Sequence, residues 1–324
     1  MHRAVLALLC AALFAACGGG EDPAAPAPVP PPARLLLDFT PNAVHSGIYL
    51  AQARRYDRAA GVALQVRAPG ASTDALKLLQ AGRTDLAILD IHDIGLARQA
   101  GRDVVGVMAL VQRPLAAVLA QPGVRTPRAL EGRRAGVSGL PSDEAVLRSV
   151  VRGAGGDAER VRAVTIGFEA VKALLARRVA AATAFWNVEG VALRARRPGI
   201  REFRVDDYGA PAYPELVLAA TRRTLRERPD LVRRTVRALA RGYDAAGRDR
   251  AAAVDALRAD VPGLDRDVLL AQAQAVAPAW TAPGRPFGVL DPAVLRAWAA
   301  WDLRFGILER PLDVRAAFDT SIAR

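Results

Sequence analysis

The chain has 324 residues, of which 52% are hydrophobic and 24% are charged, so it can bury the core of a folded protein. At about 100–200 residues per domain, this length favours two lobes. The formal net charge is +12 at pH 7, but the arginines are spread along the whole chain. A nucleic-acid-binding surface concentrates its positive charge, so we expect no nucleic-acid partner. No apolar run of the length needed to cross a bilayer follows the N-terminal segment, which argues against a polytopic membrane protein.

The N-terminus has the pattern of a secretion signal. A basic start precedes an apolar stretch over 4–14 and small residues before Cys17. The run 13–17 is similar to a bacterial lipobox, in which the cysteine is lipidated and becomes the mature N-terminus. We therefore expect a signal peptide over 1–16, a lipidated tether over 17–33 and a protein anchored by lipid alone to the extracytoplasmic face of the cell membrane. Ordinary cleavage beside an incidental cysteine is the alternative.

From Arg34, short apolar strands alternate with helical patterns. In chain order, we expect a strand at 35–37, a helix over 46–60, a strand at 64–66, a helix over 72–79, and strands at 86–89, 104–110 and 115–119. A second unit has expected strands at 135–137, 161–165 and 181–185, and a strand at 216–219 precedes a mainly helical tail. Strands separated by such helices predict βαβ units and mostly parallel sheets.

Two segments, 114–121 and 213–221, have the pattern of strands that cross between lobes. They divide the chain into lobe I over 34–116 and 218–324, and lobe II over 117–217. A ligand site in open α/β sheets lies beyond the carboxyl ends of the strands, so the loops after strands are expected to carry the functional residues.

Catalytic motifs are missing from the sequence. It contains no P-loop, no nucleophile elbow and no dinucleotide-binding glycine pattern, and no cysteine follows Cys17. His45 and His92 are too few for a catalytic zinc site. We therefore expect no enzyme activity, no cofactor and no metal. A secreted, two-lobed α/β protein of this kind is typical of an extracytoplasmic solute receptor, whose lobes close on a small molecule by a hinge motion.

The loop after the first strand carries the most specific motif. Its sequence over 38–49, DFTPNAVHSGIY, resembles the Asp-aromatic-x-Pro-Asn-x-x-His-x-Gly-x-Tyr pattern of receptors that take up pyrimidine precursors of thiamine. The resemblance continues at 72–82, 139–144 and 185–190 and covers about 34–220. The same superfamily holds the eukaryotic thiamine-pyrimidine synthase and, more distantly, alkanesulfonate-binding receptors.

This resemblance implies a two-lobed periplasmic-binding-protein fold of type II, with a mostly parallel sheet flanked by helices in each lobe and a two-strand hinge. It also implies a monomeric receptor that delivers an aminopyrimidine to the permease and ATPase subunits of an ABC importer. The candidate ligand-binding residues are Asp38, Phe39, Asn42, His45, Gly47, Tyr49, Ser72, Asp90, His92, Ser142, Glu144, Trp186, Asn187, Glu189 and Tyr208.

An aminopyrimidine is a flat ring with an amino donor and ring-nitrogen acceptors. It needs apolar faces and a few fixed polar partners, and Phe39, Tyr49 and Trp186 are candidates for the faces. The carboxylates of Asp38 and Glu189 are candidates to accept hydrogen bonds from the amino group. The other polar candidates would serve the ring nitrogens or a substituent on the ring.

Several candidates also have a purely structural explanation. Phe39 and Tyr49 could pack in the core, and His45 could be a structural histidine whose nitrogens are bonded within the protein. Asn42, Asn187 and Asp90 could cap the helices that follow them. The sequence leaves these alternatives open.

Two other functions also stay open. A related receptor could bind riboflavin, another aromatic compound or an organosulfonate, but an anion needs inward-pointing arginines, and the candidate loops contain none. A pyrimidine synthase would need a cysteine-rich metal motif and a lysine for pyridoxal phosphate. No cysteine follows Cys17, and Lys77 and Lys172 both lie in helical patterns.

Overall fold

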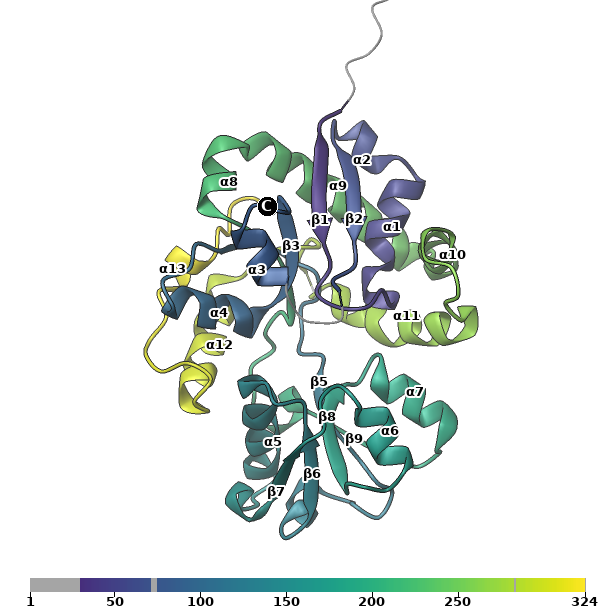
Figure 1. Cartoon of the computed structure of the whole chain (residues 1–324), viewed down its shortest axis with the longest axis vertical. Coiled ribbons are helices and arrows are strands. Elements are labelled where there is room, and N and C mark those ends of the chain that lie inside the picture. The colour runs from purple at the N-terminus through teal and green to yellow at the C-terminus, as the bar shows by residue number, and fades with distance from the viewer. Residues whose placement is uncertain (1–29, 71–74, 283, 324) are drawn as a thin grey trace, which may run out of the picture.

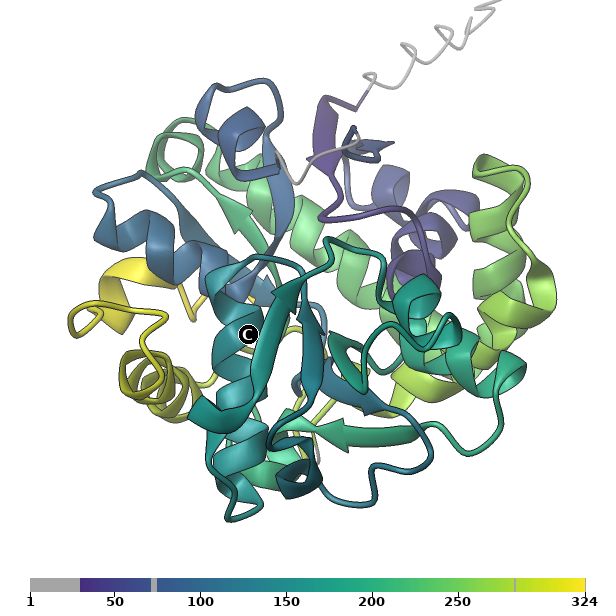
Figure 2. The ribbon, with the colours of Figure 1, turned by 60° about the horizontal axis from the view of Figure 1, so that its bottom comes forward.

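Two sheets, one above the other in Figure 1, form the two lobes of the protein. This computed structural model describes residues 30–70, 75–282 and 284–323. The predicted signal peptide, Cys17, most of the tether and Ser72 lie outside the described residues. Lobe I contains the sheet with strand order β2-β1-β3-β10-β4, and lobe II the sheet with order β7-β6-β8-β5-β9. Figure 2 shows the two lobes with lobe II brought forward.

The lobe I sheet is parallel except for one strand. Its strands are β1 (Pro32–Leu36), β2 (Ala63–Arg67), β3 (Leu86–Asp90), β4 (Val105–Ala109) and β10 (Leu216–Ala220). Strand β1 pairs in parallel with β2 and β3, whereas β10 runs antiparallel to β3 and β4. β1 begins at Pro32, inside the segment expected to be tether, because Pro32 and Ala33 already pair with Ala63 and Leu64.

The lobe II sheet has the same arrangement. Its strands are β5 (Ala116–Ala120), β6 (Arg134–Val137), β7 (Arg162–Thr165), β8 (Ala181–Phe185) and β9 (Arg201–Arg204). β6 is parallel to β7 and β8, whereas β5 is antiparallel to β8 and β9. The sequence analysis missed β9, an edge strand of sequence Arg-Glu-Phe-Arg in which only Phe203 is buried.

Helices flank both sheets. Those of lobe I are α1 (Ser46–Ala53), α2 (Tyr56–Ala59), α3 (Ala75–Gln80), α4 (Ile91–Gln99), α8 (Arg222–Glu227), α9 (Pro229–Arg248), α10 (Arg250–Asp260), α11 (Arg266–Trp280), α12 (Pro292–Arg304) and α13 (Val314–Ala317). Those of lobe II are α5 (Pro141–Gly153), α6 (Ala170–Leu175) and α7 (Glu189–Arg196). Four short 3-10 helices are η1 (Ala43–His45), η2 (Pro127–Leu130), η3 (Ala158–Arg160) and η4 (Val205–Tyr208). The predicted two-lobed α/β fold is confirmed.

The helix expected over 46–60 is interrupted. Arg55 has a left-handed backbone with φ of 55°, so α1 ends at Ala53 and α2 begins at Tyr56. Helix α9 is amphipathic, since Val232, Val236, Leu239 and Tyr243 are all buried on one of its faces. No helix within the described ranges is both long and apolar enough to cross a membrane.

The strand directions determine which loops lie between the lobes. The chain leaves β4 for β5 through 110–115, so the carboxyl ends of β4 and of its parallel neighbours face lobe II. β5 begins at this crossing, so the carboxyl ends of the antiparallel β8, and of β6 and β7, face lobe I. We call the segments 37–42, 90–93, 138–143, 166–169 and 186–189 the interlobe loops. They hold most of the candidate site residues, as the loop-after-strand argument predicts.

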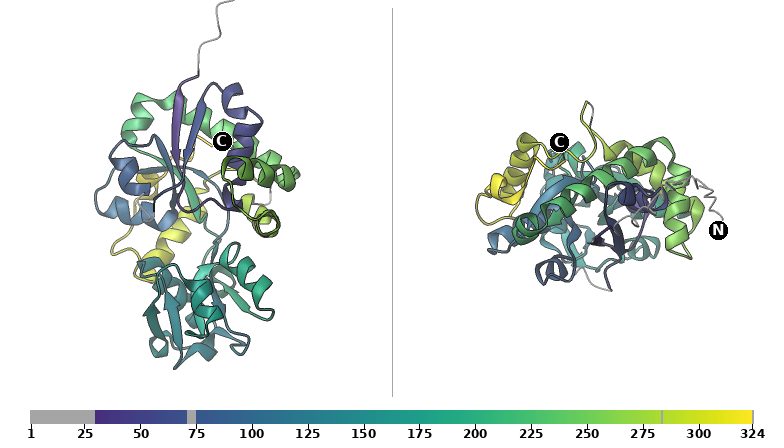
Figure 3. Two further views of the ribbon diagram at one scale, coloured as in Figure 1. Left: turned by 45° about the vertical axis from the view of Figure 1, so that its right-hand side comes forward. Right: turned by 90° about the horizontal axis from the view of Figure 1, so that it is seen from above.

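The lobes also touch beside the sheets. Figure 3 shows the C-terminal helices beside lobe I and reaching toward lobe II. There, Arg148 of α5 donates to the carbonyl of Phe305 at 2.7 Å, and the indole N–H of Trp301 lies 3.3 Å from Ser149 Oγ. Helix α12 therefore contacts lobe II although it belongs to lobe I.

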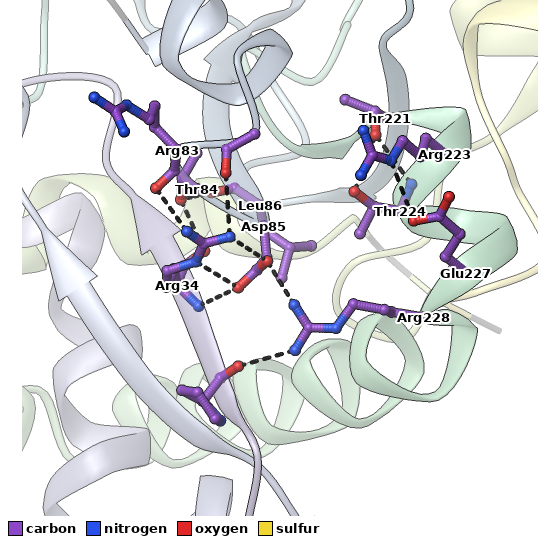
Figure 4. Close-up of polar contacts among 12 residues, drawn as sticks. Arg34, Arg83, Thr84, Asp85, Leu86, Thr221, Arg223, Thr224, Glu227 and Arg228 are labelled. Carbon is purple, nitrogen blue, oxygen red and sulfur yellow. Dashed lines mark hydrogen bonds and ion pairs between the residues drawn. The ribbon is translucent and has the colours of Figure 1, made fainter.

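A buried carboxylate joins β1, the start of β3 and α9 (Figure 4). Asp85 accepts from the backbone N and from Nε and Nη2 of Arg34 at 2.9–3.1 Å, and from Arg228 Nη1 at 2.6 Å. Burial alone would raise the pKa of Asp85, but the hydrogen bonds from Arg34 and the charges of Arg228 and Arg34 outweigh it and lower the pKa.

Replacing Asp85 by asparagine is expected to lower the free energy of unfolding at pH 7 by about 2 kcal/mol, because it leaves two arginines without their shared carboxylate. A depressed carboxyl pKa contributes stability above the unfolded-state value of about 3.9 and loses it as pH falls through the folded-state value. The difference between wild type and D85N in denaturant titrations should therefore shrink below about pH 4. Equal differences at pH 7 and pH 3 would contradict this. D255N, which breaks the exposed pair with Arg266, is the control and should change little.

Candidate functional site

An aromatic pair bridges the interlobe loops. The rings of Phe39, after β1, and Phe168, after β7, have centroids 5.8 Å apart at an angle of 49°. Phe168 is 57% exposed, which is unusual for a large apolar side chain. The structure therefore places Phe39 between the lobes, where a flat ligand could stack on it. The sequence analysis missed Phe168, because a single phenylalanine in a loop gives no pattern.

The loop after β1 is organised around His45. The ring is fully buried: Nδ1 accepts from the Asn42 backbone N–H at 3.2 Å, and Nε2 lies 2.8 Å from Asp38 Oδ1. Because Nδ1 accepts, the proton of the neutral ring is on Nε2 and is donated to Asp38. His45 therefore orients Asp38. No hydrogen bond to the second oxygen, Oδ2, is found within the described part of the chain.

The side chain of Asn42 is used inside the same loop. Its Oδ1 accepts from the Val44 N–H at 3.0 Å and its Nδ2 donates to the Thr40 carbonyl at 3.1 Å. This is the helix-capping alternative considered in the sequence analysis. Asn42 and His45 thus shape the loop, and Asp38 and Phe39 are the side chains it presents.

Gly47 and Tyr49 pack α1 into lobe I. A Cβ at Gly47 would lie 2.5 Å from Cγ of Tyr243, so only glycine lets α9 approach this closely. Tyr49 is 5% exposed, and burial together with the charge of Asp260 raises its pKa to about 12. Both residues serve the helix packing beneath the loop, and their contact with a ligand stays a prediction.

Asp90 and His92 belong to a buried network at the end of β3. Asp90 caps α4 by accepting from the His92 N–H at 2.8 Å. His92 is 2% exposed; its Nδ1 lies 2.9 Å from Asp302 Oδ2, and its Nε2 lies 3.3 Å from the Tyr213 hydroxyl. Burial lowers the pKa of His92, but the charges of Asp302, Asp90 and Glu215 raise it to about 10.

Glu215 connects, by hydrogen bonds, the two chain segments that pass between the lobes. It lies directly before β10, is 1% exposed, and accepts with Oε2 from the N–H groups of Leu115 and Ala116 at 2.6 and 3.0 Å. Leu115 directly precedes β5 and Ala116 begins it, so this carboxylate joins the outgoing and returning chain at the hinge. Oxygen or nitrogen atoms of Asp90, His92 and Glu215 lie within 4.8 Å of one another.

In lobe II, Glu189 begins α7 directly after the loop that follows β8. Its Oε2 accepts from the Phe185 N–H at 3.2 Å. Burial raises the pKa of Glu189, and the charge of Asp143 adds to this effect against the hydrogen bonds from the Glu189 and Phe185 backbone. Asp143 accepts from the Ser138 N–H at 2.9 Å. Glu189 and Asp143 therefore form the acidic part of the lobe II loops.

Ser142 and Glu144 lie beside Asp143 in the first turn of α5. Ser142 is half-buried, and Glu144 is exposed and 3.5 Å from Arg148. Acidic residues in a first helical turn are stabilised by the helix dipole, so capping accounts for their presence. Their contact with a ligand stays a prediction.

Trp186 is buried rather than open to the space between the lobes. It is 1% exposed, its indole N–H donates to the Pro114 carbonyl at 2.9 Å, and the Arg204 guanidinium lies 3.9 Å from the ring centroid. The Pro114 segment and Arg204 cover the Trp186 ring, and the expected contact of this ring with a ligand stays a prediction. Its neighbour Asn187 is fully buried, and neither of its amide atoms has a hydrogen-bond partner in the described residues.

Tyr208 packs within lobe II. Its ring lies edge-on to Phe203 with centroids 5.9 Å apart, and its carbonyl oxygen occupies the place that a Cβ at Gly153 would need. The structure shows no contact between Tyr208 and another candidate residue among those it describes.

The interlobe loops are acidic although the chain is basic. Asp38, Asp90 and Asp93 come from lobe I, and Asp143 and Glu189 from lobe II. Burial raises the pKa of Asp93, and the charge of Asp38 adds to it. Such a surface opposes an anionic ligand and favours amino groups or other hydrogen-bond donors.

Two members of the network were missed by the sequence analysis. The sequence around Glu215 could have indicated its role, because a glutamate directly before the fully buried strand β10 needs hydrogen-bond partners. The burial of Asp302 could also have been predicted, because Asp302 follows Leu295 and Trp298 at helical spacing on the buried face of α12.

The chain is similar in sequence to a curated binding protein. Over 213 residues, 65% of the chain, it is 33% identical to the formylaminopyrimidine-binding protein of Halalkalibacterium halodurans. The match spans 64% of that relative's own length, so the chain matches less than two thirds of it.

Solved structures share the fold. The alkanesulfonate-binding protein SsuA from Xanthomonas axonopodis pv. citri, bound to MOPS, has a TM-score of 0.69 and 19% identity, over 90% of this chain and 99% of that one. The periplasmic aliphatic sulphonate binding protein SsuA from Escherichia coli has a TM-score of 0.68 and 16% identity, over 89% and 92%. The family model described as NMT1/THI5 like matches residues 42–253. Because this match covers more than half of the chain, the protein belongs to the NMT1/THI5-like family.

Proposed function

We propose that the protein is an extracytoplasmic receptor that captures a thiamine pyrimidine precursor between its lobes and delivers it to an ABC importer. One observation carries this proposal: Asp38 and Glu189, carboxylates from different lobes, lie on loops that face each other, with Phe39 beside Asp38. The formylaminopyrimidine-binding relative supports the choice of ligand. The protein acts as a binding protein, without transforming the ligand.

The chemistry of these loops suits an aminopyrimidine. Asp38 Oδ2, which has no hydrogen bond from the residues that the structure describes, can accept from the exocyclic amino group, while His45 holds the other oxygen. Glu189, whose pKa burial raises, can accept from the amino group and, when protonated, donate to a ring nitrogen. The unbonded amide of Asn187 supplies one more donor and acceptor, and Phe39 supplies a ring face.

A calorimetric titration of the purified protein tests this function. We expect binding of 4-amino-5-hydroxymethyl-2-methylpyrimidine or its formylaminomethyl analogue, and no binding of butanesulfonate, because carboxylates line the interlobe loops. Tight binding of butanesulfonate without binding of either pyrimidine would assign the protein to the organosulfonate receptors instead.

We also propose that the mature protein is monomeric, is held to the membrane by a lipid on Cys17 and meets the permease and ATPase of its importer there. Replacing Cys17 by serine is expected to move the protein from the membrane fraction to the soluble extracytoplasmic fraction, because one lipidated terminus supplies the attachment. Immunoblots of fractionated cells measure this, and retention of C17S on the membrane would contradict it.

A further inference from the structure

Three side chains meet where β3 ends and β10 begins, at the base of the space between the lobes. Asp90, His92 and Glu215 each offer an atom within 4.8 Å of the others, and we call them the floor cluster. We propose that the floor cluster binds a divalent transition-metal ion, and that Zn²⁺ is the ion its one imidazole and two carboxylates fit best.

Each donor is already oriented and keeps one atom available. Asp90 uses Oδ1 to cap α4, which leaves Oδ2. Glu215 uses Oε2 for two backbone N–H groups, and no hydrogen bond to Oε1 is found in the ranges that the structure describes. Asp90 is only half-buried, so an ion can reach the cluster from the space between the lobes.

His92 is held in the manner of a metal ligand. Its Nδ1 lies 2.9 Å from the carboxylate of Asp302 and 3.2 Å from the indole N–H of Trp298, which leaves Nε2, whose neighbour at 3.3 Å is the Tyr213 hydroxyl. A metal-binding histidine commonly donates its other ring N–H to a carboxylate, which fixes the ring and strengthens the ligand.

Asp302 is the buried carboxylate that holds the His92 ring. It is fully buried, its Oδ2 contacts His92, and its Oδ1 has no hydrogen-bond partner within the described residues. A carboxylate buried in this way is costly unless a charge nearby compensates it.

The charge balance of the cluster favours a bound cation. Even when protonated, the one imidazole of His92 brings a single positive charge to three carboxylates, those of Asp90, Glu215 and Asp302, and no arginine or lysine forms an ion pair with them in the described part of the chain. Asp93 and Asp143 add further negative charge nearby. A divalent cation supplies what these side chains lack.

A bound ion would connect the lobes at the hinge. Asp90 and His92 belong to lobe I, whereas Glu215 is bonded to the first residues of β5. No metal is expected from the sequence, because the chain has few histidines, Glu215 is distant from His92 in sequence, and Asp90 was a candidate for ligand binding. The inference does not depend on the identity of the organic ligand.

Zinc binding by the full protein tests this inference. Protein stripped with EDTA and dialysed is titrated with ZnCl₂ and, separately, with MgCl₂ in a calorimeter. We expect one Zn²⁺ per chain and no heat from Mg²⁺, because imidazole is a poor ligand for Mg²⁺. X-ray absorption of the zinc-loaded protein should show nitrogen and oxygen neighbours without sulfur.

Three variants and a control locate the site. E215Q and H92Q should bind Zn²⁺ at least about 10-fold more weakly, and D302N, which changes only the partner of His92, should also weaken binding about 10-fold. H45Q is the matched control, since His45 is also buried beside a carboxylate but lies outside the floor cluster, and it should bind Zn²⁺ as wild type does. Circular dichroism confirms that each variant is folded, and D90N replaces any that is not.

The proposal would be overturned if no Zn²⁺ binding were seen up to about a 100-fold molar excess of Zn²⁺ over protein. Equal affinity of wild type and E215Q for Zn²⁺ would also overturn it. A separate titration of the metal-free protein with the aminopyrimidine reports on the receptor function. Failure of zinc binding and failure of pyrimidine binding are therefore distinguishable.

Discussion

Replacing Glu189 by alanine is expected to weaken aminopyrimidine binding about 10- to 100-fold. A hydrogen bond to a charged group contributes about 1.5–3 kcal/mol, and within the described residues the Glu189 carboxylate accepts only from the backbone N–H groups of Phe185 and Glu189. E189Q keeps one donor and one acceptor and should therefore fall between wild type and E189A. Calorimetry at pH 7 measures all three affinities.

The matched control for this prediction is E159A. Glu159 is an exposed glutamate of lobe II that pairs with Arg152, so its loss removes the same charge away from the interlobe loops and should leave affinity unchanged. If E189A bound the pyrimidine as tightly as E159A does, Glu189 would not contact the ligand.

Replacing Gly242 by alanine is expected to lower the free energy of unfolding by about 3 kcal/mol, because a side chain is forced into a filled space. The added Cβ would lie 2.2 Å from the Gly47 carbonyl oxygen and 2.7 Å from Ala51 Cβ. Backbone cannot yield as a flexible side chain can, so α1 must move away from α9. Since Tyr243 donates to the Val44 carbonyl at 2.8 Å, this movement should also weaken ligand binding through the loop that holds Asp38.

The same helix provides the control. Gly247 also lies in α9, but a Cβ there meets nothing within 4 Å. G247A should therefore match or slightly exceed wild-type stability, because alanine favours helix more than glycine does. Denaturant unfolding followed by circular dichroism compares the three proteins. Equal stability of G242A and G247A would show that α1 and α9 are not packed as described.

The sequence predicts the strand-ending loops well because hydrophobic runs and turn residues are local signals. The hydrophobic runs directly before Asp38 and Asp90 predict strands that are followed by polar residues at their carboxyl ends. Strand β9 was not predicted, because this edge strand buries only one side chain, that of Phe203, and therefore has no apolar run. The break between α1 and α2 at Arg55 was not predicted, because no glycine or proline in the sequence marks this left-handed position.

The site was predictable only in part, because burial and partners are set by residues far apart in sequence. His92 meets Asp302, which is 210 positions away, and no local pattern joins them. Trp186 looked like a binding residue after a strand, but Pro114 and Arg204 cover it. By contrast, Asp38 and Phe39 were predicted to face the ligand, and the structure leaves both among the interlobe loops.

A crystal structure of the protein with 4-amino-5-hydroxymethyl-2-methylpyrimidine tests the central claim most directly. The ring should lie between the lobes, beside Phe39, with its amino group within hydrogen-bond distance of Asp38 or Glu189. A ligand bound elsewhere, or one held between the lobes with both carboxylates turned to solvent, would contradict the account.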